Sequence, residues 1–117
     1  TDIEIIEAHH NRKVDSPSGT AQMLADSINE SLGNTLHCEY NRHDKHEKRD
    51  KNEIGMSSIR GGNIVGEHSV QFIGNFETFE IKHTSYSRNV FAEGALRAAE
   101  FIVNQQPGMY AMEDMSF

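Results

Sequence analysis

Two histidines and a lysine stand close together near the start of this sequence. His9, His10 and Lys13 follow an isoleucine-rich apolar run, residues 3–6. An imidazole ring exchanges protons near neutral pH, and a lysine ammonium group attracts carboxylates and phosphates. One short segment therefore predicts both proton transfer and the binding of an anion.

The residues after this cluster predict the start of a helix. Pro17 cannot continue a strand, so we interpret residues 9–16 as a connection between a strand and a helix. Ser18 or Thr20 can accept a hydrogen bond from the first free backbone amides, and Gly19 lets a ligand approach the backbone closely. These amides and the helix dipole favour a carboxylate or a phosphate. The alternative is an ordinary capped helix after a solvated loop, which the adjoining histidines and lysine disfavour.

The same segment carries a resemblance to a known enzyme family. Residues 4–21 read E-x-x-E-x-H-H-x-x-K-x-D-x-P-S-G-T-A. This pattern resembles the signature segment of the dihydrodipicolinate reductase (4-hydroxy-tetrahydrodipicolinate reductase) family of lysine and diaminopimelate biosynthesis. Residues 59–68, 83–95 and 107–114 also agree with that family, in the family's order. Asn63 stands where many members have aspartate.

The resemblance implies a reaction and two catalytic residues. In this family a nicotinamide delivers hydride to a cyclic, unsaturated dicarboxylate, and the enamine that forms is then protonated. His9 matches the general acid, a role that suits an imidazole with an ordinary pKa of about 6.5. Lys13 matches the second catalytic position, whose ammonium can donate a proton or stabilise negative charge. Which of the two supplies the proton stays open at this point.

The resemblance also implies a substrate-binding set and assigns no metal. Arg88 matches a second basic contact, whose planar guanidinium could bind a carboxylate through two hydrogen bonds. No residue of this chain is assigned to cofactor binding. The remaining residues that match substrate-holding positions of the family are His10, Ser18, Gly19 and Thr20.

The length of the chain predicts which part of such an enzyme is present. Its 117 residues make one domain, and no Gly-x-Gly-x-x-Gly turn of a dinucleotide site occurs in them. The resemblance therefore implies that residues 1–117 are a C-terminal substrate-binding and oligomerisation domain of a homotetramer. NADH or NADPH would be bound mainly by an N-terminal Rossmann domain. The alternative is a non-catalytic dicarboxylate-binding oligomerisation module, which a Rossmann fingerprint upstream of Thr1 would argue against.

Composition excludes several other classes of protein. The formal charge of −7 argues against general nucleic-acid binding. No apolar stretch is long enough to span a membrane, and a single cysteine cannot form an internal disulfide. We therefore expect a cytoplasmic protein.

A zinc site is the remaining alternative from the residues. His43-x-x-His46, with His37 and Cys38 nearby, could contribute ligands, but structural zinc sites have four ligands at firmer spacing. The segment is a dense run of charges without periodicity, so we interpret residues 42–53 as a mobile exposed loop.

Periodicity and turn signals predict the elements that position the cluster. Helical spacing predicts helices over residues 18–32 and from Arg88 to before Pro107. A short strand is expected within residues 35–40, and three consecutive antiparallel strands are expected over residues 54–59, 63–72 and 76–83, with a turn at Gly74-Asn75.

These elements predict an α+β fold: a mostly antiparallel or mixed sheet of four or five strands with two helices packed on one face. If Val65, Ile73 and Phe79 line the other face, that face predicts a subunit interface. His68 falls in a strand pattern, so we interpret it as a structural hydrogen-bonding group outside the site.

Overall fold

The computed structural model describes residues 1–116 and divides them into two compact units. The first unit is Thr1–Tyr86, and the second begins at Ser87. Each unit has its own secondary structure.

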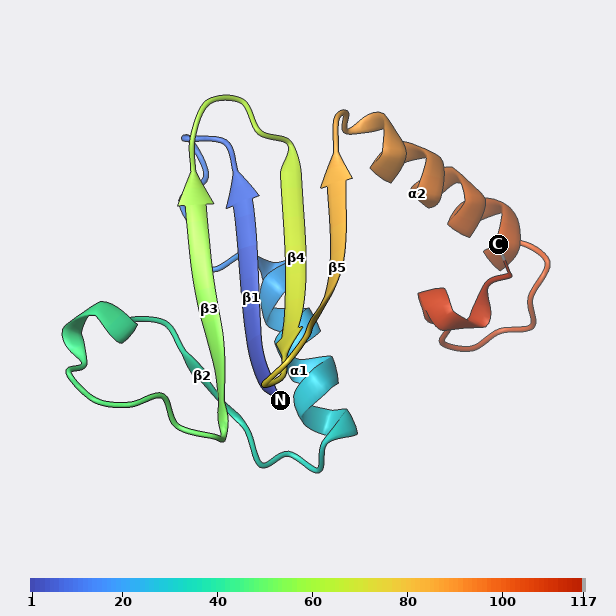
Figure 1. The fold of residues 1–117 in the computed structure, drawn as a ribbon. Coiled ribbons are helices and arrows are strands. Elements are labelled where there is room, and N and C mark those ends of the chain that lie inside the picture. The colour runs from blue at the N-terminus through green and yellow to red at the C-terminus, as the bar shows by residue number, and fades with distance from the viewer. Residues whose placement is uncertain (117) are drawn as a thin grey trace. The chain divides into compact units, whose positions relative to one another are not determined.

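A five-stranded mixed sheet with one helix forms the first unit (Figure 1). The strand order is β2-β3-β1-β4-β5, so β1 is the central strand. It pairs in parallel with β3 and antiparallel with β4, while β2 is parallel to β3 and β5 is antiparallel to β4. The bounds are β1 Asp2–His9, α1 Gly19–Ser31, β2 His37–Glu39, β3 Glu53–Arg60, β4 Gly66–Ile73 and β5 Thr78–Ser85. The predicted α+β class with a mixed sheet is confirmed.

The strand order corrects one prediction from the sequence. Residues 54–59 and 63–72 do form strands, but they are not antiparallel neighbours, because β1 lies between them. The central strand is hydrogen-bonded along both edges, which a hairpin of β3 and β4 would have prevented. The expected turn at Gly74-Asn75 does join β4 to β5, and the Gly74 amide donates to the Glu77 carbonyl at 2.8 Å.

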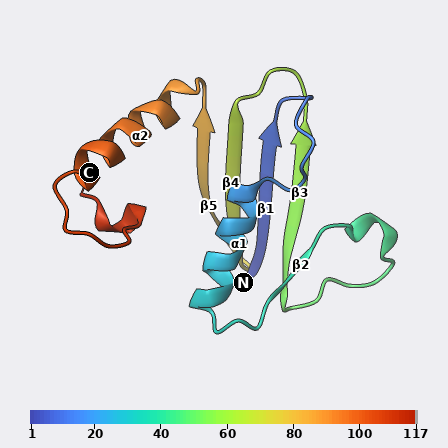
Figure 2. The ribbon, with the colours of Figure 1, turned by 180° about the vertical axis from the view of Figure 1, so that it is seen from behind.

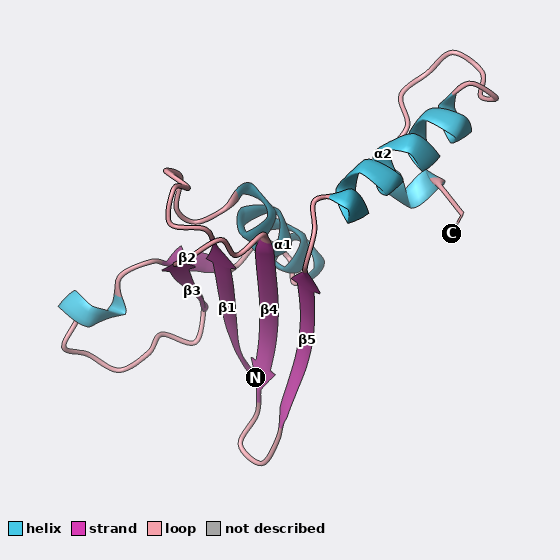
Figure 3. Ribbon diagram, turned by 90° about the horizontal axis from the view of Figure 1, so that it is seen from above, coloured by secondary structure: helices cyan, strands magenta, loops and turns pink. Residues whose placement is uncertain are grey.

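Helix α1 covers one face of the sheet, as Figures 2 and 3 show from two directions. Its bounds agree with the prediction, since Ser18 is the N-cap and Leu32 the C-cap. Two alanines on its inner face, Ala21 and Ala25, are 0% and 1% exposed and bring the helix backbone close to the strands. The buried core that they contact consists of Ile3, Ile5, Ile54, Met56 and Val70.

Strand register divides this covered face into two halves. Side chains that lie opposite each other on paired strands share a face, and alternate residues along a strand return to it. The apolar half comprises the rows Ile3–Ile54–Phe72 and Ile5–Met56–Val70. The polar half continues the same strands with the rows Glu7–Ser58–His68 and His9–Arg60. The residues of the polar half lie toward the end of β1 from which the polar loop leaves.

The uncovered face differs from its predicted composition. Phe79 pairs with Phe72, so it lies on the covered side of the sheet, where it remains 63% exposed. Val65 precedes β4, and of the three predicted residues only Ile73 takes an uncovered-face position in a strand. A shallow hollow on this face is lined by apolar and polar side chains alike: Ile6, Ala8, Ile59, Glu67, Ser69, Gln71, Glu80 and Lys82.

The charged segment at residues 42–53 is attached to the sheet by its arginines. It contains a short 3-10 helix, Arg42–Asp44. Arg42 donates to the Glu53 carboxylate at 2.6 Å, and Arg49 donates to the Ile3 carbonyl at 2.7 Å. Its mobility stays a prediction.

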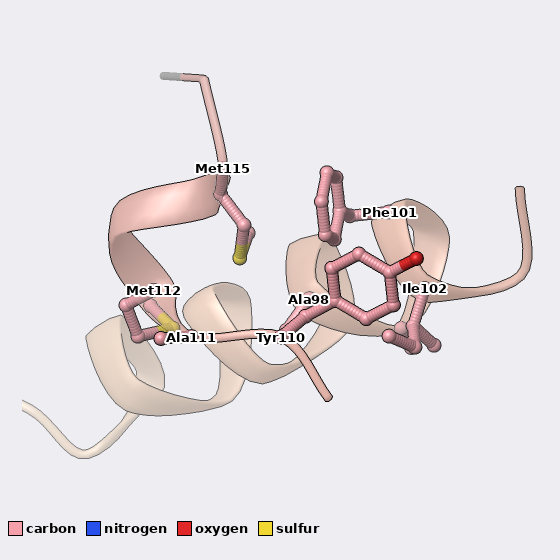
Figure 4. Close-up of a pocket in the computed structure, with 8 residues that line it drawn as sticks. Ala98, Phe101, Ile102, Tyr110, Ala111, Met112 and Met115 are labelled. Atoms are coloured by element: carbon pink, nitrogen blue, oxygen red, sulfur yellow. The ribbon is translucent and has the colours of Figure 1, made fainter. Parts of the chain in front are cut away.

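The second unit consists of α2, Asn89–Ile102, and a tail with a 3-10 turn, Met112–Asp114. The predicted helix after Arg88 is confirmed. Figure 4 shows the hollow between this helix and the tail, where the Phe101 and Tyr110 rings meet edge to face at 5.8 Å. Its volume is about 460 Å³, and its lining is Ala98, Ala99, Phe101, Ile102, Tyr110, Ala111, Met112 and Met115. Such a lining offers packing surface and little acid or base chemistry.

Candidate functional site

The candidate site begins with a histidine held against a buried carboxylate at the end of β1. Glu7 and His9 are two residues apart, so both project from the covered face. His9 Nδ1 lies 2.5 Å from Glu7 Oε2, within hydrogen-bond distance, and the two side chains are 12% and 1% exposed. A carboxylate so deeply buried requires partners for both of its oxygens.

Arg60 is the principal partner of Glu7. Its NH1 donates to Oε2 at 2.9 Å and its NH2 donates to Oε1 at 2.8 Å, which is a bidentate pair. Burial alone would raise the pKa of Glu7, but hydrogen bonds from Arg60, Ser58 and His9 outweigh it and lower the pKa from 4.5 to about 2. The carboxylate is therefore ionised at any pH at which the protein would work.

The Glu7 carboxylate also reaches the start of α1. The Ser18 amide donates to Glu7 Oε1 at 3.2 Å, and Arg60 NH2 donates to the Asp15 carbonyl at 2.8 Å. The helix end of the connection between β1 and α1 is thereby attached to this ion pair at two points. The loop after β1 is fixed further by the Gly61 amide, which donates to the His9 carbonyl at 3.0 Å.

Ser18 joins the helix start to a second histidine. Its Oγ accepts from the Ala21 amide at 3.1 Å, which is the N-cap hydrogen bond, and lies 3.0 Å from Nε2 of His68. The His68 ring also meets the His9 ring edge to face, with centroids 5.2 Å apart. Burial lowers the pKa of His68, and the positive charges of His9, His83 and Lys13 lower it further. His68 is therefore neutral at pH 7.

Lys13 lies in the loop between β1 and α1, with its ammonium nitrogen 2.9 Å from Asp15 Oδ1. That hydrogen bond lowers the pKa of Asp15. The Asp15 side chain is 61% exposed, and an ion pair in such a position contributes little to stability. The ammonium group can therefore exchange this partner for an incoming carboxylate at small cost.

The other predicted residues lie on the same loop and helix start, except one. His10 follows His9 directly, and Gly19 and Thr20 form the exposed first turn of α1. A Cβ placed on Gly19 would meet nothing within 4 Å, so the space above this turn is open. Arg88 belongs to the second unit, where it is the residue before α2, and its part in the site stays a prediction.

Sequence reasoning missed three residues of this arrangement: Glu7, Arg60 and His68. Glu7 shares the spacing i, i+2 with His9, which on a strand places the two side chains together, so the sequence did carry that signal. Arg60 and His68 come from β3 and β4, and only the strand order brings them beside β1.

Residues 1–116 contain neither a metal-binding cluster nor a helix that could span a membrane. No group of three or more histidine, cysteine, aspartate or glutamate side chains in that range is arranged to hold a metal ion. No helix in the same range has the length and apolar character needed to cross a membrane.

Comparison with protein families places the whole arrangement in a known context. Residues 1–115 match the family model described as "Dihydrodipicolinate reductase, C-terminus". The 4-hydroxy-tetrahydrodipicolinate reductase of Brachyspira hyodysenteriae is 56% identical over 97% of this chain and 49% of its own length. The corresponding protein of Clostridium tetani is 57% identical over 97% of this chain and 44% of its own length. The chain thus spans about half the length of the curated relatives it matches.

A solved structure shares this fold as well. The dipicolinate-bound dihydrodipicolinate reductase from Paenisporosarcina sp. TG-14 superposes with a TM-score of 0.75 and 28% sequence identity. The match covers 98% of this chain and 44% of that one.

Proposed function

The chain belongs to the dihydrodipicolinate reductase C-terminal family, and we propose that it is the substrate-binding and proton-donating domain of a 4-hydroxy-tetrahydrodipicolinate reductase. The resemblance stated from the sequence is thereby confirmed at the level of the family. The proposed reaction converts a cyclic dicarboxylate to tetrahydrodipicolinate in the biosynthesis of diaminopimelate and lysine. The observation that carries the proposal is His9, held by a buried carboxylate at the edge of an open helix start.

NADH or NADPH supplies the hydride when it is bound. The described residues do not fit a dinucleotide, because their glycine pair Gly61-Gly62 lies between β3 and β4 and opens no helix. We therefore propose that the dinucleotide is held mainly by an N-terminal domain in a longer protein. The part of the reaction left to this chain is to hold the dicarboxylate and to protonate it.

His9 is the proposed proton donor. In its protonated form the ring has an N–H bond at each nitrogen, and Glu7 accepts the one at Nδ1. The proton on Nε2 is then the one available for transfer. Lys13, the second proposed catalytic residue, lies on the same loop and adds positive charge beside the substrate.

Positive groups at the start of α1 are proposed to hold the dicarboxylate. The amides of Gly19 and Thr20 and the positive end of the helix dipole suit one carboxylate, and the Thr20 hydroxyl and His10 can add hydrogen bonds. The second carboxylate calls for another cation, which we assign to Arg88. The solved relative is described as dipicolinate-bound, and dipicolinate is a planar dicarboxylate of this kind.

Calorimetric titration with pyridine-2,6-dicarboxylate tests the binding half of the proposal. We expect saturable binding that is lost in a double variant, Lys13→Ala with Arg88→Ala. Lys82→Ala is the matched control, since Lys82 lies on the uncovered face. If neither the chain nor the longer protein binds the dianion, the proposed substrate is wrong.

Turnover of His9→Gln in the longer protein tests the chemical half. We expect kcat to fall by about 10²- to 10⁴-fold, because a positioned general acid contributes rate on that scale. The Michaelis constant should change much less, since Gln keeps a polar group in place. Normal turnover would remove His9 from the role of proton donor. Binding of the dicarboxylate without any reductase activity in the longer protein would favour the non-catalytic binding module instead.

The assembly and location of the protein are also proposals. We propose a cytoplasmic homotetramer built through this domain. Large apolar side chains of the sheet that remain exposed, such as Ile59 at 52% and Ile81 at 58%, suit contact with another copy. Light scattering after size-exclusion chromatography measures the molar mass of the assembly. A monomeric mass at micromolar protein concentration would contradict the proposed tetramer.

A further inference from the structure

The Glu7 carboxylate is held by a set of hydrogen bonds, although the proposed function gives Glu7 no chemical role. Its carboxylate oxygens are held by several groups of the site, Ser58 among them. Oε2 accepts from His9 Nδ1 and Arg60 NH1, and Oε1 accepts from Arg60 NH2 and the Ser18 amide. The carboxylate therefore cannot rotate without breaking several of these bonds at once.

This fixed acceptor determines which nitrogen of His9 carries a proton in the neutral ring. An ionised carboxylate only accepts hydrogen bonds, so the Nδ1 that faces it at 2.5 Å must be the donor. A neutral imidazole has one N–H, and here that N–H is committed to Glu7. Nε2 is left as the nitrogen that takes up a proton and releases it.

The backbone beside Nε2 belongs to a glycine. Gly66 of β4 lies on that side, and the Cβ of any larger residue there would come to 3.4 Å from Nε2. The His68 ring abuts His9 edge to face at an interplanar angle of 72°, which limits rotation of the His9 ring about its Cβ. Orientation and tautomer are thus both set from outside the ring.

We infer that Glu7 is a positioning residue: it holds His9 with Nδ1 as the hydrogen-bond donor, so that Nε2 is the nitrogen that delivers the proton, and Arg60 holds the carboxylate through both of its oxygens. This inference rests on the proposed role of His9. In the step it describes, the Nε2–H bond breaks with its electron pair staying on nitrogen. A C–H bond forms with the electron pair of the enamine, and the Nδ1 proton stays against Glu7 throughout.

The tautomer of His9 is the direct test. We would record nitrogen–proton spectra of the chain with isotope-labelled histidine at alkaline pH, where imidazole is neutral, and assign His9 by the signal lost in His9→Gln. The wild type should show the Nδ1–H form, and Glu7→Ala should convert His9 to the Nε2–H form. Glu4→Ala is the matched control, because Glu4 lies on the same strand and pairs with arginines but faces the other side.

An Nε2–H form in the wild type, or an unchanged spectrum in Glu7→Ala, would overturn the inference. If Glu7→Ala does not fold, the wild-type spectrum decides alone. If Glu7 serves only folding, the folded fraction of Glu7→Ala should keep the wild-type tautomer of His9.

Steady-state kinetics of Glu7→Gln in the longer protein supply the second readout. We expect kcat to fall by about tenfold or more, with KM nearly unchanged, because orientation of the donor matters in the transition state and not for binding. A rise in KM with kcat unchanged would contradict a positioning role. If the wild-type longer protein has no reductase activity, the proposed function fails, while the tautomer experiment still reports on Glu7 and His9. If the longer protein is active but the tautomer of His9 is the same in Glu7→Ala as in the wild type, only the positioning role is overturned.

Discussion

The apolar and polar halves of the covered sheet face each place a fully buried side chain on β1, but the two side chains are stabilised in opposite ways. Ile5 and Glu7 stand two residues apart on β1, and each is 1% exposed. Ile5 needs only apolar neighbours, and any side chain of the right size supplies them. Glu7 needs the particular partners that β3, the start of α1 and its own strand bring to it.

This difference teaches how one strand can carry both the core and the candidate site. The alternation of Ile3, Ile5, Glu7 and His9 is unbroken, so the backbone does not change where the chemistry begins. The difference is that the stability contributed by the polar half depends on pH and on individual hydrogen-bond partners, whereas that of the apolar half does not. That dependence separates the two halves experimentally.

The largest expected effect comes from removing the charge partner of Glu7. Arg60→Met leaves a buried carboxylate without its bidentate donor, and breaking a buried ion pair in this way costs about 3–5 kcal/mol at pH 7. The loss should shrink as the pH falls, because the unpaired carboxylate becomes protonated. Urea unfolding at pH 7 and at acidic pH measures both values. A loss that is the same at both would show that the charge of Glu7 is not the cause.

The matching change in the apolar half is Ile54→Ala. Ile54 is 1% exposed and pairs with Ile3, so its truncation should cost about 3 kcal/mol of unfolding free energy. No titrating group is involved, and we therefore expect the same loss at neutral and acidic pH. A strong pH dependence in this variant would erase the distinction between the two halves.

Acid titration of the wild type should reveal the polar half by itself. Because the folded-state pKa of Glu7 is lowered from 4.5 to about 2, its stabilisation is fully present above the unfolded value and is lost as the pH falls through that window. The shift corresponds to at most about 3 kcal/mol. The measurement is the free energy of unfolding of the wild type and of Glu7→Gln at several pH values between neutral and strongly acidic. Glu7→Gln should lose less stability over that range, and Glu4→Gln should follow the wild type there more closely.

The smallest expected effect lies where the two halves meet the helix. Ser18→Ala removes the N-cap acceptor of the Ala21 amide and the hydrogen bond to His68, and we expect a loss of about 1 kcal/mol. Ser31→Ala is the control, since its hydroxyl bonds only to a carbonyl of the same helix at an exposed position. Equal melting temperatures of the two variants would mean that the hydrogen bonds of the Ser18 hydroxyl do not stabilise the fold.

Local pattern was enough to predict most elements and to bring several residues of the candidate site together. Periodicity located both helices, and residue types located the strands, because these signals lie within a few residues of each other. His9, Lys13 and the Ser18 cap were visible for the same reason. Glu7 could have been added from its spacing to His9.

The pairing of distant segments could not be predicted in this way. Arg60 is 53 residues from Glu7, and nothing in its own neighbourhood indicates that β3 lies beside β1. The same gap explains why β3 and β4 were expected to be neighbours and why Phe79 was assigned to the wrong face. Strand order depends on which edges are satisfied across the whole sheet, a property of no single segment.

The central place of β1 has a consequence for how the protein forms. This strand leaves the ribosome before either of its neighbours, since its register partners begin at Ile54 and at Glu67. Long loops must close before β1 gains its first sheet hydrogen bond, and such distant pairings slow folding. Glu7 receives its countercharge only at that moment. Closure of the sheet and completion of the candidate site at the end of β1 therefore depend on the same pairing, and a nascent chain that stalls before Arg60 has neither.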